Sequence, residues 1–203
     1  MSDGELAPCL GIIRGDWNLV PNQTGATTNS GETDILDLGT SIWAIDIDVN
    51  IKDRKHFDEW DRFLTSRNLQ EHTFVMPRPL RRLPADGTIT SDTGLTLQSY
   101  DYANSTLTFS GGGSAKKASF GDMVSYRTAG SGYWIGQVTS EATADGSGNI
   151  TFGVSPRPVA PHASEPLPRR IEALGEFRLS EPHRKREKFK DYSISFKAEQ
   201  VIR

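Results

Sequence analysis

The sequence predicts a mainly β protein that carries one packed α-helix and an inserted small β-barrel. Three patterns predict this fold: a strictly alternating segment at 40–52, a helical apolar stripe at 53–68, and five short alternating segments between 87 and 158. The composition agrees, because 19 glycines and 11 prolines in 203 residues indicate many turns. A chain of this length can bury a sizeable core, and we expect strands to outnumber helices.

The first strand is predicted at 40–52, where apolar residues alternate with small or polar ones, including Asp46 and Asp48. Its buried face would hold Trp43, Ile45, Ile47, Val49 and Ile51. The preceding segment 21–34 is rich in Asn, Thr, Ser and Gly and has no apolar periodicity. It therefore predicts either a long mobile loop or an extended hairpin.

A helix is predicted from the capping residue Asp53 to about Asn68. Its apolar stripe consists of residues at positions i, i+3, i+6 and i+7, namely Phe57, Trp60, Phe63 and Leu64. We expect this stripe to lie on a sheet. A short strand at 73–76 should follow and end at Pro77, since proline cannot donate to a β-ladder.

Residues 80–86 resemble a linker, and a second module of short strands is predicted after them. The expected strands are 88–102, 106–110, 118–127, 133–144 and 149–155. The segment 133–154 should form one hairpin around the turn 145–149. Prolines at 156–168 would then stiffen the return to a terminal strand at 191–202 that pairs with the first module. The predicted domains are 1–86 plus 159–203, and the insert 87–158.

Charge is distributed unevenly between the two ends of the chain. Residues 1–50 contain eight acids and only Arg14 as a base, whereas 166–203 contain ten Lys or Arg and six acids. Such asymmetry can steer the ends together within one chain or between copies. The basic run Arg184, Lys185, Arg186, Lys188 and Lys190 is diluted by Glu181, Glu187 and Asp191. A solvated or inter-subunit face is therefore favoured over nucleic-acid binding, and no sequence-specific nucleic-acid contact is expected.

The cellular context is also constrained by the sequence. Cys9 is the only cysteine, which excludes an intrachain disulfide and a cysteine-rich metal cluster. The first 13 residues lack the basic region of a signal peptide, and no stretch approaches about 18 apolar residues. We expect synthesis in a reducing host cytoplasm, no membrane insertion, and exit from the cell only by lysis or inside a particle.

The sequence contains no motif that would bring its candidate catalytic residues together. Cys9 and one of His56, His72, His162 and His183 are the residue types of a thiol peptidase dyad, but a small packing cysteine is favoured. No histidine pair has i, i+4 metal spacing. Asp46 and Asp48 would lie about 7 Å apart, within the range of glycosidase carboxylates, although a solvated strand face is the commoner explanation.

A glycine-rich run and a set of aromatic residues are two further motifs, and each has a simpler structural explanation. The run Gly111 to Lys117 lacks the order of a phosphate-binding loop and is predicted to be a hairpin loop. An aromatic set in the insert offers stacking faces for sugar rings, but core packing is favoured: Tyr100, Tyr102, Tyr126, Tyr133 and Trp134. The sequence therefore predicts no catalytic, cofactor-binding or metal-binding residue, and a protein that is not an enzyme.

The order of these elements resembles the distal tail protein of long-tailed bacteriophages. Residues 57–69 followed by His72 to Pro77 are similar to that family's helix, strand and proline exit. Within the insert, four segments are similar to a stretch found in phage tail-tip subunits: 118–124, 136–139, 144–150 and 154–158. Members of the family often end in a galectin-like domain, whereas this chain is expected to return to its first module.

The resemblance implies a tail-tube-like β-sandwich, six copies in a ring, and a place in the virion at the phage tail tip. The ring would contact the tail tube protein above and a hub or tail-tip protein below, while the insert would anchor tail fibres or touch host sugars. The tail tube protein itself is a close alternative. A free carbohydrate-binding or host-recognition module and a tail-associated lysin are alternatives of other classes.

Overall fold

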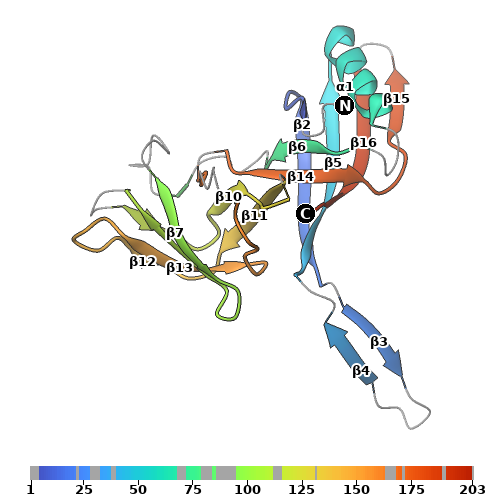
Figure 1. Cartoon of the computed structure of the whole chain (residues 1–203). Coiled ribbons are helices and arrows are strands. Elements are labelled where there is room, and N and C mark those ends of the chain that lie inside the picture. The colour runs from blue at the N-terminus through green and yellow to red at the C-terminus, as the bar shows by residue number, and fades with distance from the viewer. Residues whose placement is uncertain are drawn as a thin grey trace.

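The structure is a computed structural model that describes residues 5–21, 23–27, 33–37, 40–67, 72–78, 84–85, 95–111, 116–130, 132–162, 168–170, 172–188 and 191–202, with the backbone alone for 23–27 and 33–37. The fold is mainly β, with one helix among these residues and several sheets (Figure 1). Each of the two largest sheets has its own cluster of buried side chains.

The larger sheet joins the two ends of the chain. Its strand order is β1-β6-β14-β16-β5-β2, and β15 pairs with the free half of one edge of β16. The strands are β1 (Glu5–Leu6), β2 (Ile12–Val20), β5 (Ile42–Ile51), β6 (Phe74–Pro77), β14 (Leu174–Leu179), β15 (Arg184–Lys188) and β16 (Asp191–Gln200). The C-terminal strand β16 lies in the middle, antiparallel to β5, which confirms the predicted return of the chain to its N-terminal part.

The alternation predicted for 40–52 is confirmed in β5. Trp43, Ile45, Ile47 and Val49 are at most 4% exposed and face the core together with Phe196 of β16. The opposite face of β5 presents its polar residues. A bulge in β2 between Ile12 and Arg14 shifts the register of β2 against β5.

Helix α1 (Arg54–Ser66) covers the apolar face of this sheet, against β16 and β5 (Figure 1). The carboxylate of Asp53 accepts a hydrogen bond from the backbone N–H of Lys55 at 2.9 Å and caps the helix. All four residues of the predicted stripe are buried: Phe57, Trp60, Phe63 and Leu64. The helix, its cap and its buried face are therefore confirmed, and the helix ends at Ser66, two residues before the predicted end at about Asn68.

The second large sheet has the order β10-β11-β13-β8-β7. Its strands are β7 (Thr96–Asp101), β8 (Thr106–Ser110), β10 (Met123–Arg127), β11 (Tyr133–Val138) and β13 (Ile150–Ser155). A separate two-stranded sheet pairs β9 (Lys117–Ala118) with β12 (Ala142–Thr143). The predicted strand 106–110 is confirmed. Residues 88–94 of the first predicted strand lie outside the described residues, and the closure of these strands into a barrel stays a prediction.

Two of the predicted strands are wrong as single elements. Segment 118–127 divides into β9 and β10 at a turn in which the Ser119 N–H donates to the Asp122 carboxylate, and Gly121 has a φ of 85°. Segment 133–144 divides into β11 and β12 because the Thr139 N–H donates to Gly153 O and Ser140 Oγ accepts from the Gly153 N–H. The expected hairpin 133–154 is thus reduced to a short β11–β13 pairing, although its turn at 145–149 is confirmed by hydrogen bonds to Asp145.

The two cores share residues across their boundary. Met123 and Ile135 belong to the second sheet by sequence but pack into the core of the first sheet. The indole Nε1 of Trp43 donates to the Ile135 carbonyl oxygen at 3.1 Å. In return, Ile202 packs against the second core. The domain boundaries at 86/87 and 158/159 stay a prediction.

Candidate interaction surfaces

A two-stranded hairpin projects from the larger sheet. β3 (Gln23–Thr27) and β4 (Thr33–Asp37) pair antiparallel with each other and with no other described strand. Figure 1 shows them extending past the ends of β2 and β5, away from α1. Of the two alternatives for 21–34, the extended hairpin is confirmed. An isolated two-stranded hairpin is only marginally stable in water, so packing against another protein surface would stabilise this one.

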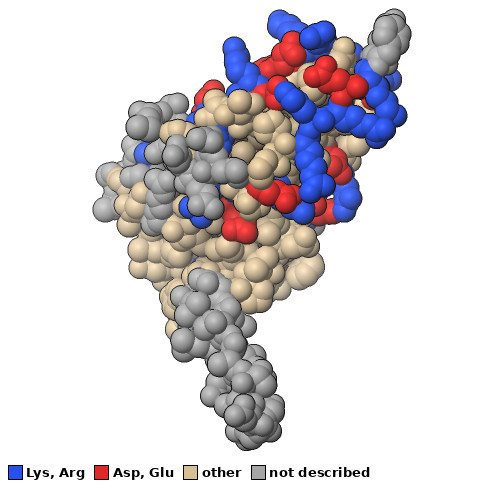
Figure 2. All heavy atoms as spheres, turned by 90° about the vertical axis from the view of Figure 1, so that its right-hand side faces the viewer, with Lys and Arg blue, Asp and Glu red and all other residues tan. Residues whose placement is uncertain are grey.

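The basic run predicted from the sequence forms an edge strand. All five residues of β15 are exposed, and four of them are basic. The cross-strand partners in β16 place Arg184, Arg186 and Lys188 on the polar face of the sheet, while Lys185 points to the α1 side. Figure 2 shows the side of the molecule that is on the right in Figure 1. On its upper part, Lys and Arg side chains are gathered and interspersed with Asp and Glu. Lys190 lies outside the described residues.

Asp61 of α1 fixes β15 against the helix. Its Oδ2 lies 2.9 Å from Lys185 Nζ, and its Oδ1 lies 3.0 Å from His183 Nε2. Partial burial acts to raise the pKa of Asp61, but the hydrogen bonds from Lys185 and His183 outweigh burial and lower it. The hydrogen bond that Lys185 donates to Asp61 also raises the pKa of Lys185. Among the described strands, β15 pairs with β16 alone.

The polar face of the sheet carries interleaved charges of both signs. Arg14 of β2 contacts Asp16, and its Nη1 lies 3.8 Å from Asp48 Oδ2. Lys197 Nζ lies 3.2 Å from Glu181 Oε1. By contrast, Arg184, Arg186 and Lys188 form no ion pair with another described residue. Hollows of about 280 and 240 Å³ lie on either side of Arg184.

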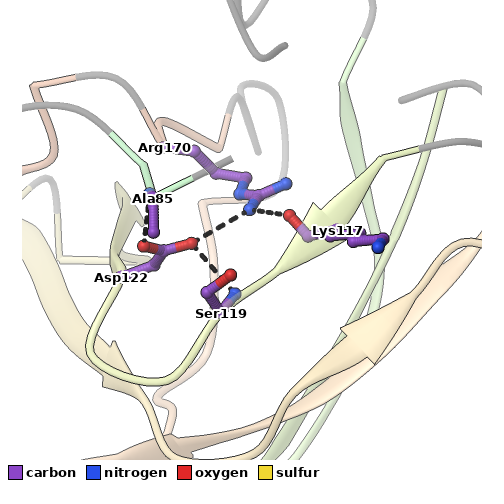
Figure 3. Close-up of polar contacts among 5 residues, drawn as sticks. All are labelled: Ala85, Lys117, Ser119, Asp122 and Arg170. Carbon is purple, nitrogen blue, oxygen red and sulfur yellow. Dashed lines mark hydrogen bonds and ion pairs between the residues drawn. The ribbon is translucent and has the colours of Figure 1, made fainter. Parts of the chain in front are cut away.

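A buried ion pair holds the chain segments that enter and leave the second sheet. Asp122 accepts from the backbone N–H groups of Ala85 at 2.8 Å and Ser119 at 3.0 Å. Arg170 Nη2 lies 3.5 Å from Asp122 Oδ2 and donates to the Lys117 carbonyl at 2.5 Å (Figure 3). Both charged side chains are at most 3% exposed, so each offsets part of the cost of burying the other. This cluster is structural, since its acceptors are occupied by the protein's own donors.

The candidate catalytic residues are dispersed in the structure. Cys9 Sγ is directed to the Ala7 carbonyl at 3.4 Å, His56 pairs with Asp53 and His183 pairs with Asp61. His72 precedes β6, and the His162 N–H donates to Arg127 O. Among the described residues, no group of three His, Cys, Asp or Glu side chains has metal-binding geometry.

The acidic pair and the glycine-rich run are placed differently. Asp46 and Asp48 lie on the polar face of β5, with Arg14 beside Asp48, as expected of a solvated strand face. The prediction of a hairpin loop at 111–117 is wrong, because β8 and β9 belong to different sheets and do not pair. Residues 112–115 of that run lie outside the described residues.

The aromatic set of the second sheet separates into core and surface. Tyr126 and Trp134 are at most 1% exposed and stack with ring centroids 4.9 Å apart, as the core-packing explanation predicts. Tyr100 and Tyr102 are 41% and 43% exposed. The Arg157 guanidinium lies over the Tyr102 ring at 5.3 Å. The sequence alone does not show that Tyr100 is exposed, because a bulge between Leu97 and Ser99 breaks the alternation of β7.

Comparison with known proteins adds no relative to these observations: the chain matches no protein-family model and no curated protein sequence. Among the described residues, no helix is long and apolar enough to cross a lipid bilayer.

Proposed function

We propose that this chain is a non-enzymatic structural subunit of a bacteriophage tail, one of six copies that form a ring between the tail tube and the hub. In this proposal the seven-stranded sheet with α1 is a tail-tube-like domain, and 87–158 form an inserted barrel. The segments that resemble phage tail subunits coincide with elements of the fold, since 57–69 contains most of α1 and His72 to Pro77 leads into β6. In the insert, 118–124 spans the turn between β9 and β10, 136–139 the end of β11, 144–150 the turn between β12 and β13, and 154–158 the end of β13.

The β3–β4 hairpin is the observation that carries the assembly role. It pairs with no other described strand, and its sequence between 21 and 34 has little apolar content to offset the entropy of ordering it. A neighbouring copy or ring would supply the missing surface. The isolated chain is then expected to be largely monomeric at low concentration and to assemble in the particle.

Cryo-EM of phage particles tests this role directly. Six copies should surround the tail axis between tube and hub, with 21–34 ordered at a protein contact. A complete tail tip without this chain would refute the proposal, and long tubes built from the chain alone would assign it to the tail tube instead. Native mass measurement of the purified protein and its complexes gives an independent copy number.

A carbohydrate-binding module is the second candidate, and the exposed pair Tyr100 and Tyr102 favours it. Exposed aromatic rings offer apolar faces to the CH groups of sugars. The chain would then bind glycans as a monomer, and Tyr100→Ala together with Tyr102→Ala would abolish binding. Phe120, which is 65% exposed at a different turn, provides the control Phe120→Ala.

A further inference from the structure

We propose that the open edge of β15 is the docking site for the β3–β4 hairpin of a second copy of this chain. This inference rests on the proposed assembly role and names the surface that receives the hairpin. Three observations carry it: unpaired backbone edges, opposite charge, and the separation of the two elements within one copy.

The backbone of β15 is available for one more strand. One edge of β15 pairs with β16, and its other edge pairs with no described strand. The outer edges of β3 and β4 are open in the same way. An open edge presents a row of N–H and C=O groups that an added strand satisfies. β15 and β4 are both five residues long, so such a pairing would use the whole of each strand.

The opposite charges of β15 and the hairpin favour the hairpin as the strand that is added to β15. β15 contains four basic residues and one acid, whereas 22–39 contains the acids Glu32, Asp34 and Asp37 and no Lys or Arg. Like charges placed opposite each other destabilise a strand pair, so two β15 edges repel each other. The hairpin instead has a net charge opposite to that of β15, where Arg184, Arg186 and Lys188 form no ion pair with another described residue.

The receiving strand is held in place before docking. Asp61 binds both Lys185 and the preceding His183 from the α1 side. Arg184, Arg186 and Lys188 remain on the other face of β15. A surface that is fixed in advance loses less conformational entropy when a partner binds.

The contact must join different copies. In Figure 1 the hairpin extends from one end of the sheet, whereas β15 lies beside α1 at the other end. Each copy therefore offers one hairpin and one receiving edge, which is a head-to-tail interface that propagates until a ring closes. A polyanion such as a nucleic acid is the competing ligand for β15, but it would not use the open backbone edge, and Glu187 and Glu181 nearby disfavour it.

A charge exchange between two full-length variants tests the docking. One variant carries Arg184→Glu, Arg186→Glu and Lys188→Glu, and the other carries Glu32→Lys, Asp34→Lys and Asp37→Lys. Each variant alone gives the hairpin and β15 net charges of the same sign, so its self-association in sedimentation velocity at low salt should weaken about tenfold or more. An equimolar mixture should regain association to within about threefold of the wild type, because each hairpin then meets a β15 of opposite charge.

A matched control separates docking from net charge. Lys52→Glu, Lys55→Glu and Arg62→Glu change the charge by the same amount at exposed positions in and beside α1, and this variant should associate like the wild type. Circular dichroism would confirm that all variants are folded.

Four outcomes would overturn the docking. They are a wild type that stays monomeric at low salt even at the highest soluble concentration, association unaffected by either variant, a mixture that is not rescued, and heparin binding by the wild type that is lost in the β15 variant without any self-association. If cryo-EM nevertheless finds the chain in the tail-tip ring, the proposed function stands and only the docking site is wrong.

Discussion

The indole nitrogen of Trp60 donates a hydrogen bond to the carbonyl oxygen of Leu10, 2.9 Å away. Leu10 lies in the turn that leads into β2, so α1 is tied to the N-terminal segment as well as to the sheet beneath it. The same indole ring packs on Phe63 and Phe196, with centroids 6.3 and 5.8 Å away. One side chain thus joins three parts of the first core.

Trp60→Ala is expected to destabilise the protein by about 3 to 5 kcal/mol, because the 1% exposed indole would leave a cavity. Urea unfolding followed by circular dichroism measures the change. Glu59→Ala, at an exposed neighbouring position, is the control and should stay within about 0.5 kcal/mol of the wild type. A loss below about 1 kcal/mol for Trp60→Ala would contradict the role given to the indole.

Replacement of 87–158 by a Gly-Ser linker should leave a folded remainder that unfolds cooperatively. We expect lower stability than in the full chain, because Met123 and Ile135 leave the first core and Trp43 loses its hydrogen-bond acceptor. Circular dichroism and urea titration report both properties. An aggregated or unfolded product would show that the two cores depend on each other and that the predicted boundary is wrong.

Asp122→Asn should cost about 3 to 5 kcal/mol, because it removes a negative charge that faces the buried guanidinium of Arg170. The double variant Asp122→Asn with Arg170→Met should lose less than the two single variants combined, since neither charge is then buried alone. Chemical denaturation of all four proteins completes the cycle. Strict additivity would indicate that Asp122 acts only through its hydrogen bonds to Ala85 and Ser119.

Tyr126 is expected to make stability fall at high pH. Burial raises the pKa of its phenol well above the ordinary value of 10.0. The folded protein therefore keeps a proton that the unfolded chain releases above about pH 10, so this contribution is full below that pH and declines above it by about 1.4 kcal/mol per pH unit. Tyr126→Phe should show a shallower decline when unfolding is followed between pH 9 and 11. Equal slopes for both proteins would refute the assignment.

Patterns with a single period were sufficient for part of the fold. β5 alternates without interruption, and α1 has a capping residue and an apolar stripe of the correct spacing, so both follow from local sequence. The central position of β16 also followed from its alternation. These elements bury one complete face, which makes the pattern unambiguous.

Other elements carry no such pattern. β2 contains a bulge after Ile12, so its apolar residues fall out of phase, and it was not predicted as a strand. β15 is exposed along its whole length and has no apolar face to detect. The turn at 119–122 depends on hydrogen bonds between Ser119 and Asp122, which the sequence marks only by the pair Gly121-Asp122. The proposed docking surfaces could not be predicted for the same reason, because an unpaired backbone edge can be recognised only when the pairing of the strands is known.

The central place of β16 has a consequence for how the protein is made. β16 separates β14 and β15 from β5, yet it comprises the last ten residues before Val201. During synthesis, one edge of β5 stays uncovered until β16 has been made, whereas the preceding residues 95–155 already contain all five strands of the second sheet. The order of synthesis therefore favours folding of the second sheet first. A truncated chain that ends before β16 would lack the strand between β14 and β5, and the unpaired edge of β5 would then promote aggregation.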